Sequence, residues 1–158
     1  MCLKSAADDN AVEIRCVAAC DTIALRDAAL RPDLPPGGSL YPGDEAPETL
    51  HLGAFSDNTL VAVATLCCEA MPGTRSTTSW RLRGMATLPE YRGCGLGRQL
   101  AQRCIAYAAE QGGTCVWCTS RVATVAFYRA LGFIECSDTF SLPEFSDALY
   151  IRMQRPLP

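Results

Sequence analysis

Residues 92–97 read Arg-Gly-Cys-Gly-Leu-Gly, and they separate a strand-like stretch from a helix-like stretch. The strand-like stretch, residues 80–88, is mostly apolar and ends near Pro89. After Gly97, apolar residues recur at helical spacing up to residue 108, with arginines and glutamines between them. A glycine-rich turn that opens a helix leaves several backbone N–H groups unpaired at the positive end of the helix dipole. This stretch therefore predicts a binding site for an anion such as a pyrophosphate.

Other glycine-rich turns have different requirements. A Walker A loop ends in Gly-Lys followed by serine or threonine, and no lysine follows Gly97. A Rossmann turn needs the spacing Gly-x-Gly-x-x-Gly and an acidic residue at the end of a second strand, whereas Glu110 falls at a helix end. A tight turn that binds no ligand stays open from these residues alone.

A second motif follows at residues 126–133, which read Ala-Phe-Tyr-Arg-Ala-Leu-Gly-Phe. With both motifs in this order, the sequence resembles the GCN5-related N-acetyltransferase (GNAT) superfamily. In that family, Arg/Gln-x-x-Gly-x-Gly/Ala grips the pyrophosphate of acyl-CoA, and Arg92, Gly95 and Gly97 match this pattern. A later Phe-Tyr-x-x-Leu-Gly-Phe segment supplies a tyrosine beside the CoA sulfur, and Tyr128 occupies that position here.

The resemblance covers residues 50–138 well and is looser before and after them. Strand-like stretches lie at residues 11–17, 49–55, 60–69, 80–88, 114–119, 133–136 and 149–153, and helix-like stretches at 20–30, 98–110 and 120–131. Residues 31–48 hold five of the ten prolines and predict a loop. We expect one α+β domain over residues 1–158, a GNAT-like mixed, mostly antiparallel sheet flanked by helices, with residues 1–10 and 154–158 frayed.

Length and charge argue against several classes of protein. A chain of 158 residues suits one domain, and its net charge of −3 comes without any lysine- or arginine-rich run. Nucleic-acid modules carry a basic stripe, so we expect no nucleic-acid partner. No apolar run approaches the ~18 residues of a membrane span, and the first residues contain no apolar segment of signal-peptide length. We therefore expect a cytoplasmic protein with no membrane partner.

Ten cysteines and a single histidine raise the question of a metal site. Cys115-x-x-Cys118 lies in a strand-like stretch, where residues three apart point to opposite faces. Such a pair cannot readily bind one metal ion together, and the same holds for the adjacent residues Cys67 and Cys68. We therefore expect no metal, and we interpret most cysteines as small buried hydrophobic residues.

The resemblance implies acetyl-CoA as co-substrate. Backbone N–H groups after Arg92 would bind its pyrophosphate, and its pantetheine arm would pair with exposed backbone at the end of the central strand. Gly84, inside that strand, indicates either a β-bulge or a close-packing site. Arg121 stands where many relatives carry an asparagine that touches pantetheine, so it could contact a CoA phosphate or fix the loop. The predicted cofactor-binding residues are Met85, Ala86, Thr87, Arg92, Gly93, Cys94, Gly95, Leu96, Gly97, Arg98 and Arg121.

Tyr128 is the predicted catalytic residue. A phenol with a pKa of ~10 can protonate a departing thiolate whose acid has a pKa of ~8.5. The general base is left open, because many relatives carry a glutamate in the central strand and residues 80–88 contain no acid. His51 and Glu69 are candidates, beside deprotonation through ordered water and backbone carbonyls, and the position of Glu90 in the turn predicts a surface residue.

The sequence thus predicts an acyl-CoA-dependent N-acyltransferase whose acceptor, a small-molecule amine or a protein amino group, attacks the thioester directly. A non-catalytic CoA-binding module is the alternative, and a nucleotide-binding protein that shares only the turn is a third. Arg81 and Arg83 could meet an acidic acceptor or pair with nearby carboxylates. Tyr41, Asp44 and Glu45 could line the acceptor site. Homodimers are common in the family, and a homodimer is left open.

Overall fold

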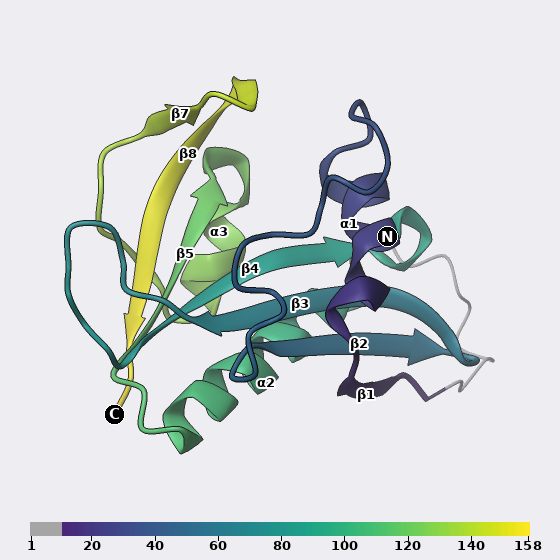
Figure 1. Cartoon of the computed structure of the whole chain (residues 1–158), viewed down its shortest axis with the longest axis horizontal. Coiled ribbons are helices and arrows are strands. Elements are labelled where there is room, and N and C mark those ends of the chain that lie inside the picture. Colours follow the sequence, from purple (N-terminus) through teal and green to yellow (C-terminus); the bar gives the residue numbers. More distant parts are fainter. Residues whose placement is uncertain (1–10) are drawn as a thin grey trace.

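The protein folds around one mixed β-sheet, and the computed structural model describes residues 11–158, apart from the side chains of residues 145–147 (Figure 1). The strands are β1 (Glu13–Cys16), β2 (Leu50–Ser56), β3 (Thr59–Cys68), β4 (Ser79–Thr87), β5 (Cys115–Arg121), β6 (Ile134–Glu135), β7 (Phe140–Leu142) and β8 (Phe145–Pro156). The helices are α1 (Ile23–Leu30), α2 (Leu96–Glu110) and α3 (Val125–Ala130), with 3₁₀ turns η1 (Ala19–Thr22), η2 (Pro89–Tyr91) and η3 (Val122–Thr124).

The strand order is β1-β2-β3-β4-β5-β8-β6, and β7 pairs with β8. Only β4 and β5 run parallel, and they pair only where Ser79–Arg81 face Cys115–Trp117. Beyond Arg81 and Trp117 the two strands diverge (Figure 1). We call this unpaired region the β4–β5 split. The predicted fold class, an α+β domain with a mixed, mostly antiparallel sheet flanked by helices, is confirmed.

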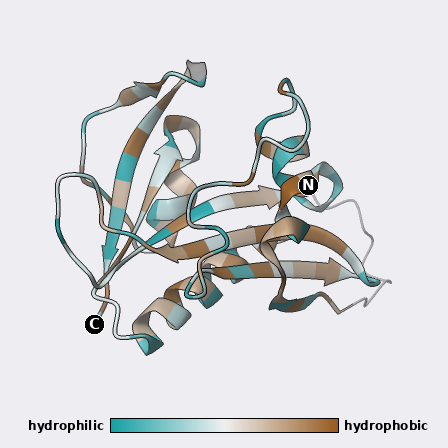
Figure 2. Ribbon diagram, viewed as in Figure 1, coloured by the Kyte–Doolittle hydropathy of each residue, from teal (hydrophilic) through white to brown (hydrophobic). Residues whose placement is uncertain are grey.

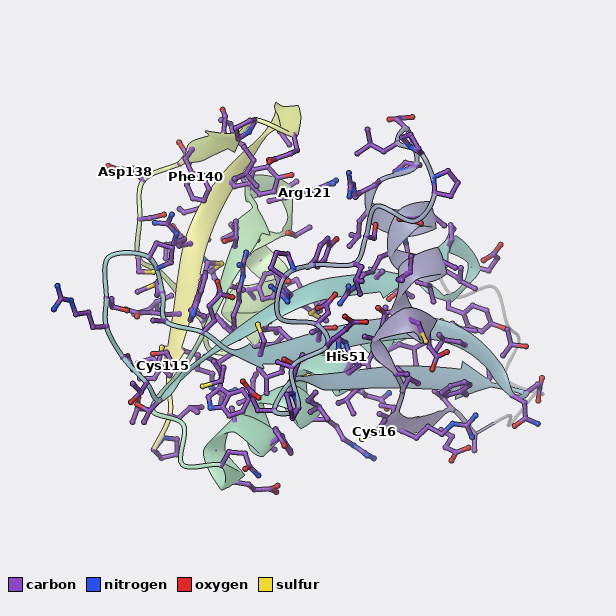
Figure 3. All side chains as sticks on the ribbon, viewed as in Figure 1. Cys16, His51, Cys115, Arg121, Asp138 and Phe140 are labelled. Atoms are coloured by element: carbon purple, nitrogen blue, oxygen red, sulfur yellow. The ribbon has the colours of Figure 1, made fainter. Side chains whose placement is uncertain are left out.

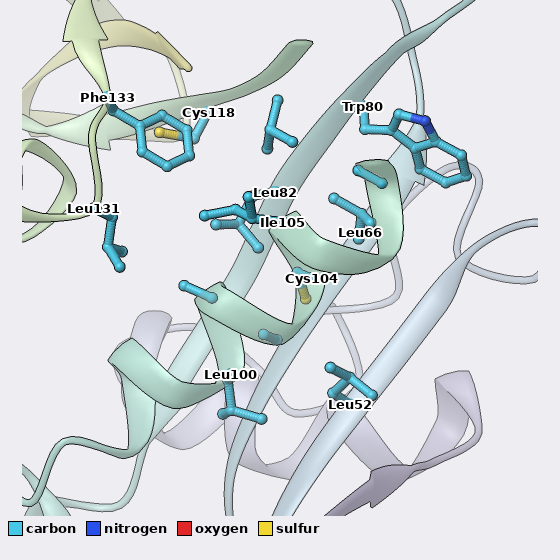
Figure 4. Close-up of a cluster of buried hydrophobic side chains, with 14 of the residues drawn as sticks. Leu52, Leu66, Trp80, Leu82, Leu100, Cys104, Ile105, Cys118, Leu131 and Phe133 are labelled. Carbon is cyan, nitrogen blue, oxygen red and sulfur yellow. The ribbon is translucent and has the colours of Figure 1, made fainter. Parts of the chain in front are cut away.

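Helices cover both faces of the sheet. The apolar stripe of α2, which includes Leu100, Cys104 and Ile105, is buried against the sheet, whereas its arginines and glutamines are exposed (Figure 4). Burial of each side chain of this size contributes about 1.5–3 kcal/mol to the stability of the fold. On the other face, α1 places Leu25 against Val63 of β3 and Ala86 of β4. Figure 2 shows hydrophobic residues along much of β2 and β3, the strands between these two layers.

Some sequence predictions need correction. Residues 154–158 are not frayed, because β8 continues antiparallel to β5 as far as Pro156, and the Leu157 N–H donates to the Thr114 carbonyl across 2.9 Å. The predicted helix over residues 120–131 is shorter, because β5 runs on through Arg121 before α3 begins. Strand β7 is not among the predicted elements. The prediction for residues 1–10 lies outside the described residues.

Gly84 serves both of the roles that its sequence position suggests. The pairing of β3 with β4 shifts register between Val63 and Thr65, where Gly84 and Met85 of β4 together face Ala64 of β3, so Gly84 lies within the bulge, with φ at +61°. A Cβ atom on Gly84 would also lie only 2.7 Å from Nε of Arg26, a fully buried side chain of α1. The bulge therefore exists together with an arginine packed closely against the backbone.

We expect Gly84→Ala to lower the free energy of unfolding by about 2–4 kcal/mol, because it combines left-handed strain with overpacking. Gly73→Ala is the matched control, since Gly73 has φ at +85° and a Cβ atom there would meet nothing within 4 Å. Gly73→Ala should lower the free energy of unfolding by the backbone strain alone, about 1–2 kcal/mol. Urea unfolding measures both, and equal losses would show that contact with Arg26 adds nothing.

Candidate active site at the β4–β5 split

The turn before α2 presents backbone donors to solvent. Gly93 and Gly95 have φ at +76° and +81°, and both are exposed. The first helical hydrogen bond of α2 runs from the Gln99 N–H to the Gly95 carbonyl, so the helix makes no use of the N–H groups of residues 96–98. Arg92 and Arg98 are exposed on either side. A helix N-terminus that follows such a loop, with two cations beside it, suits a doubly charged phosphate group.

The predicted pantetheine segment lies on the open edge of β4. Within the described residues, β5 pairs with β4 no further than Arg81, so Met85, Ala86 and Thr87 have an unpaired edge toward the split. The Arg92 guanidinium donates through Nε to the Thr87 carbonyl across 3.3 Å, which ties the glycine turn to the end of this strand. An extended chain lying along the edge would find backbone donors and acceptors there.

Tyr128 faces the same split from α3. Its hydroxyl donates to Met85 Sδ across 3.7 Å, and its ring packs edge-on against Phe127 and Phe133. Burial raises the pKa of the Tyr128 phenol above its ordinary value, and the nearby Cys118 thiol adds to the rise. Gly97 lies close to Phe127 and to the end of Met85. The strand edge, the glycine turn and the phenol are thus brought together, although their roles in binding and catalysis stay predictions.

Comparison with known proteins agrees with this arrangement. The sequence model of the Acetyltransferase (GNAT) family matches residues 21–133, which is more than half of the chain. The chain belongs to this family. An uncharacterized N-acetyltransferase of Bacillus subtilis (strain 168), YitI, is 33% identical over 132 residues, covering 84% of this chain and 89% of YitI.

Solved structures share the GNAT fold at low sequence identity. An acyl-CoA N-acyltransferase from Pseudomonas aeruginosa superimposes with a TM-score of 0.73 at 22% identity, covering 92% of this chain and 99% of that one. An aminoglycoside 6'-N-acetyltransferase complexed with coenzyme A gives 0.72 at 16% identity, covering 92% and 98%. These likenesses establish the fold.

A buried polar network fastens the proline-rich loop of this GNAT protein to the sheet. Arg26 donates to Asp44 Oδ2 at 2.6 Å, to Thr65 Oγ1 at 2.6 Å and to the Ser39 carbonyl at 2.8 Å. Arg83 donates to Asp44 Oδ1 at 2.9 Å. Burial disfavours the charged carboxylate, yet the bonds from Arg26, the Tyr41 N–H and Arg83 outweigh it and lower the pKa of Asp44. Asp44 is therefore an anchor of the loop, and its predicted role of lining the acceptor site has no support in these contacts.

The same network removes His51 from the candidates for a general base. Its Nε2 lies 2.7 Å from the Asp44 carbonyl, which can only accept, so Nε2 carries the proton. Its Nδ1 lies within hydrogen-bond distance of Thr65 Oγ1, at 2.7 Å, and that hydroxyl also accepts from Arg26. Both ring nitrogens of this buried histidine are occupied, so it has no lone pair for an incoming amine (Figure 3).

The remaining candidate is Glu69, while Glu90 is exposed, as its position in the turn predicts. Glu69 follows β3 and pairs with Arg81 at 3.3 Å and with Arg83 at 3.8 Å, at the closed end of the split. Of the two interpretations of Arg81 and Arg83 left open by the sequence, pairing with carboxylates is thus observed. Glu90 lies exposed in η2, outside the strand where many relatives have their glutamate. Arg121 is exposed at the end of β5, and its guanidinium donates to the Leu30 carbonyl across 3.4 Å (Figure 3). This contact joins the end of β5 to the end of α1.

The site residue that the sequence prediction lacks is Arg26. An arginine in a short amphipathic helix is ordinarily exposed, so the helical pattern alone does not mark it. The signal lies elsewhere, in the glycine at position 84, which leaves room for a buried guanidinium against β4.

Cysteines and cavities add little to the site. Cys67, Cys104 and Cys118 are buried, and burial raises the pKa of these thiols to about 11, 12 and 12. Cys16, Cys20 and Cys68 are exposed, so the expectation that most cysteines are buried is only partly correct. The part of the chain that the structure describes contains no group of three metal-ligating side chains and no helix able to cross a membrane. A groove of about 540 Å³ between α2 and β1–β2 lies away from the split.

Proposed function

We propose that this GNAT protein transfers an acyl group, with acetyl as the simplest case, from acyl-CoA to a primary amine that attacks the thioester directly. The observation that carries the proposal is the early end of the β4–β5 pairing at Arg81 and Trp117. It leaves a strand edge, a glycine turn and a phenol around one opening. The aminoglycoside acetyltransferase of this fold was solved with coenzyme A, which supports CoA as the carrier.

Coenzyme A would be held by the backbone more than by side chains. The N–H groups of residues 93–98 bind the pyrophosphate oxygens, and Arg92 and Arg98 supply positive charge. The pantetheine lies along Met85, Ala86 and Thr87 as an added strand. The thioester then reaches the part of the split beside Tyr128, with its carbonyl oxygen polarised by a backbone N–H of the β4 edge.

The chemical step moves one acyl group and one proton. The neutral amine attacks the carbonyl carbon, the new C–N bond forms and the C–S bond breaks. The departing thiolate takes the proton of the Tyr128 hydroxyl, and the proton lost by the amine returns to the phenolate through water. No carboxylate in β4 serves as base, so ordered water, oriented by backbone carbonyls, takes the amine proton first.

Arg92→Gln should weaken acetyl-CoA binding by about tenfold, because it removes one charge-assisted contact to the pyrophosphate. Arg103→Gln is the matched control, since Arg103 is exposed on α2 and carries the same charge. Isothermal titration calorimetry gives both affinities.

CoA release across a panel of amines separates an enzyme from a CoA-binding module. Binding of ATP or NAD without binding of acetyl-CoA at millimolar concentration would contradict the proposal.

A further inference from the structure

One face of the sheet carries four arginines around the β4–β5 split. Arg81 pairs with Trp117, and Thr119 pairs with Arg152. Paired residues, and residues two apart in a strand, share a face of a sheet. The four arginines on this face are Arg81, Arg83, Arg121 and Arg152. Thr65 pairs with Arg83 and contacts Arg26 of α1, so this is the face bordered by α1 and the proline-rich loop.

The charges on this face are distributed unevenly. Arg81 and Arg83 have carboxylate partners in Glu69 and Asp44, and Asp44 also pairs with Arg26. Arg152 and Arg121 have no carboxylate partner among the described side chains: Arg152 lies over the Phe140 ring at 5.0 Å, and Arg121 contacts only a backbone carbonyl. The β5–β8 side of the split therefore holds two cations that no described carboxylate compensates, although the whole chain has a net charge of −3.

Arg152 has the features of an anion-binding residue. It is half-buried, and the Phe140 ring, itself stacked on Tyr150, restricts its guanidinium. A planar guanidinium held in place can form two parallel hydrogen bonds with a carboxylate. Phe140 and Arg121 lie toward the same end of the β5–β8 arm (Figure 3). The arm is thus built to receive negative charge beside the open end of the split.

The closed end of the split holds Glu69, whose carboxylate is already paired with Arg81 and Arg83. Trp117 Nε1 donates to the Glu69 carbonyl at 2.8 Å, so the partly exposed Glu69 lies beside Trp117. Arg152 faces Thr119, two residues further along β5, which is roughly 7 Å in a strand. A carboxylate held by Arg152 therefore lies within the length of one small molecule of the closed end of the split.

We propose that the acceptor is a primary amine that also bears a carboxylate, as an amino acid does, with its carboxylate on Arg152 and its amine directed into the split. This proposal rests on the proposed acyl transfer. Arg121 extends the positive field toward the entrance. A polycationic amine would meet repulsion on this face, because two guanidinium groups there have no counter-ion among the described side chains.

The test uses amine pairs that differ only in a carboxylate, such as β-alanine with ethylamine and phenylalanine with phenethylamine. With acetyl-CoA, kcat/KM should be at least about tenfold higher for the acid of a pair, as one charge-assisted contact allows. Arg152→Gln should abolish this preference, Arg152→Lys should restore part of it, and Arg103→Gln should leave it unchanged. Acetyl-CoA affinity should stay constant in all three variants.

Two failures can be told apart. If the unsubstituted protein does not bind acetyl-CoA, the proposed function fails. If it binds acetyl-CoA but acetylates the amines without a carboxylate equally well, the inference about the acceptor fails while the proposed function stands. Should no pair be turned over, calorimetry on the CoA-saturated protein compares N-acetyl-β-alanine with N-ethylacetamide. Tighter binding of the acid that is lost in Arg152→Gln supports the inference, and equal or absent binding of both overturns it.

Discussion

Replacing Tyr128 with phenylalanine is expected to lower kcat for acyl transfer by about 100-fold or more, while acetyl-CoA affinity changes by less than about twofold. The substitution removes only the hydroxyl, which contacts Met85 Sδ, and keeps the ring that packs against Phe127 and Phe133. The thiolate would then leave without a proton donor. Single-turnover kinetics with the fastest amine measure the chemical step free of product release.

Tyr107→Phe supplies the control for this substitution. Tyr107 is a partly buried tyrosine of α2 that packs edge-on against Trp80, away from the split. Its loss of a hydroxyl should leave the rate unchanged. An equal rate for Tyr128→Phe and the unsubstituted protein would remove Tyr128 from the mechanism.

The pH profile gives an independent check on Tyr128. Because burial raises the pKa of this phenol, the proton needed for the thiolate stays bound well into the alkaline range. The rate should therefore rise with pH as more amine becomes neutral, and ionisation of Tyr128 should cause no fall below about pH 10. An alkaline fall near pH 8 that disappears in Tyr128→Phe would contradict the raised pKa of Tyr128, whereas an alkaline fall that remains in Tyr128→Phe would belong to another group.

The parts of the site that sequence predicts best are those with local signals. Gly93 and Gly95 adopt positive φ next to the start of α2, and the spacing of apolar residues marks the buried face of that helix. These patterns depend on residues a few positions apart, so they can be recognised in the sequence without knowledge of tertiary contacts. The order of the central elements follows from the same signals.

The parts that sequence does not predict depend on distant partners. Arg26 meets Asp44 and Thr65, which lie 18 and 39 positions further along the chain. The Asp44 carboxylate, which its sequence position assigns to an acceptor loop, serves as the counter-ion of that arginine. The ordered end of β8 is a similar case, because its polar and proline-rich sequence resembles a loose terminus until β5 supplies its pairing partner.

Asp44→Asn is expected to lower the free energy of unfolding at pH 7 by about 3–5 kcal/mol, the cost of leaving a buried cation unpaired. Arg26 is fully buried and Asp44 nearly so, and Arg83 loses a partner too. Urea unfolding measures the loss.

Glu135→Gln provides the contrast to Asp44→Asn, since Glu135 pairs with the exposed Arg129 and its loss should cost under about 1 kcal/mol. The pKa of Asp44 is lowered by folding, so its contribution is complete above the unfolded value of ~3.9 and disappears as pH falls through the lower folded value. The stability gap between the protein and Asp44→Asn should therefore persist from about pH 8 to about pH 5 and close only in stronger acid.

Adding Arg26→Met to Asp44→Asn should recover part of the stability, because no buried charge then lacks a partner on that helix. The double variant could instead have a lower free energy of unfolding than Asp44→Asn, by as much as the loss of a large buried side chain costs. In that case Arg26 stabilises the fold mainly through packing against Gly84, and charge pairing contributes less.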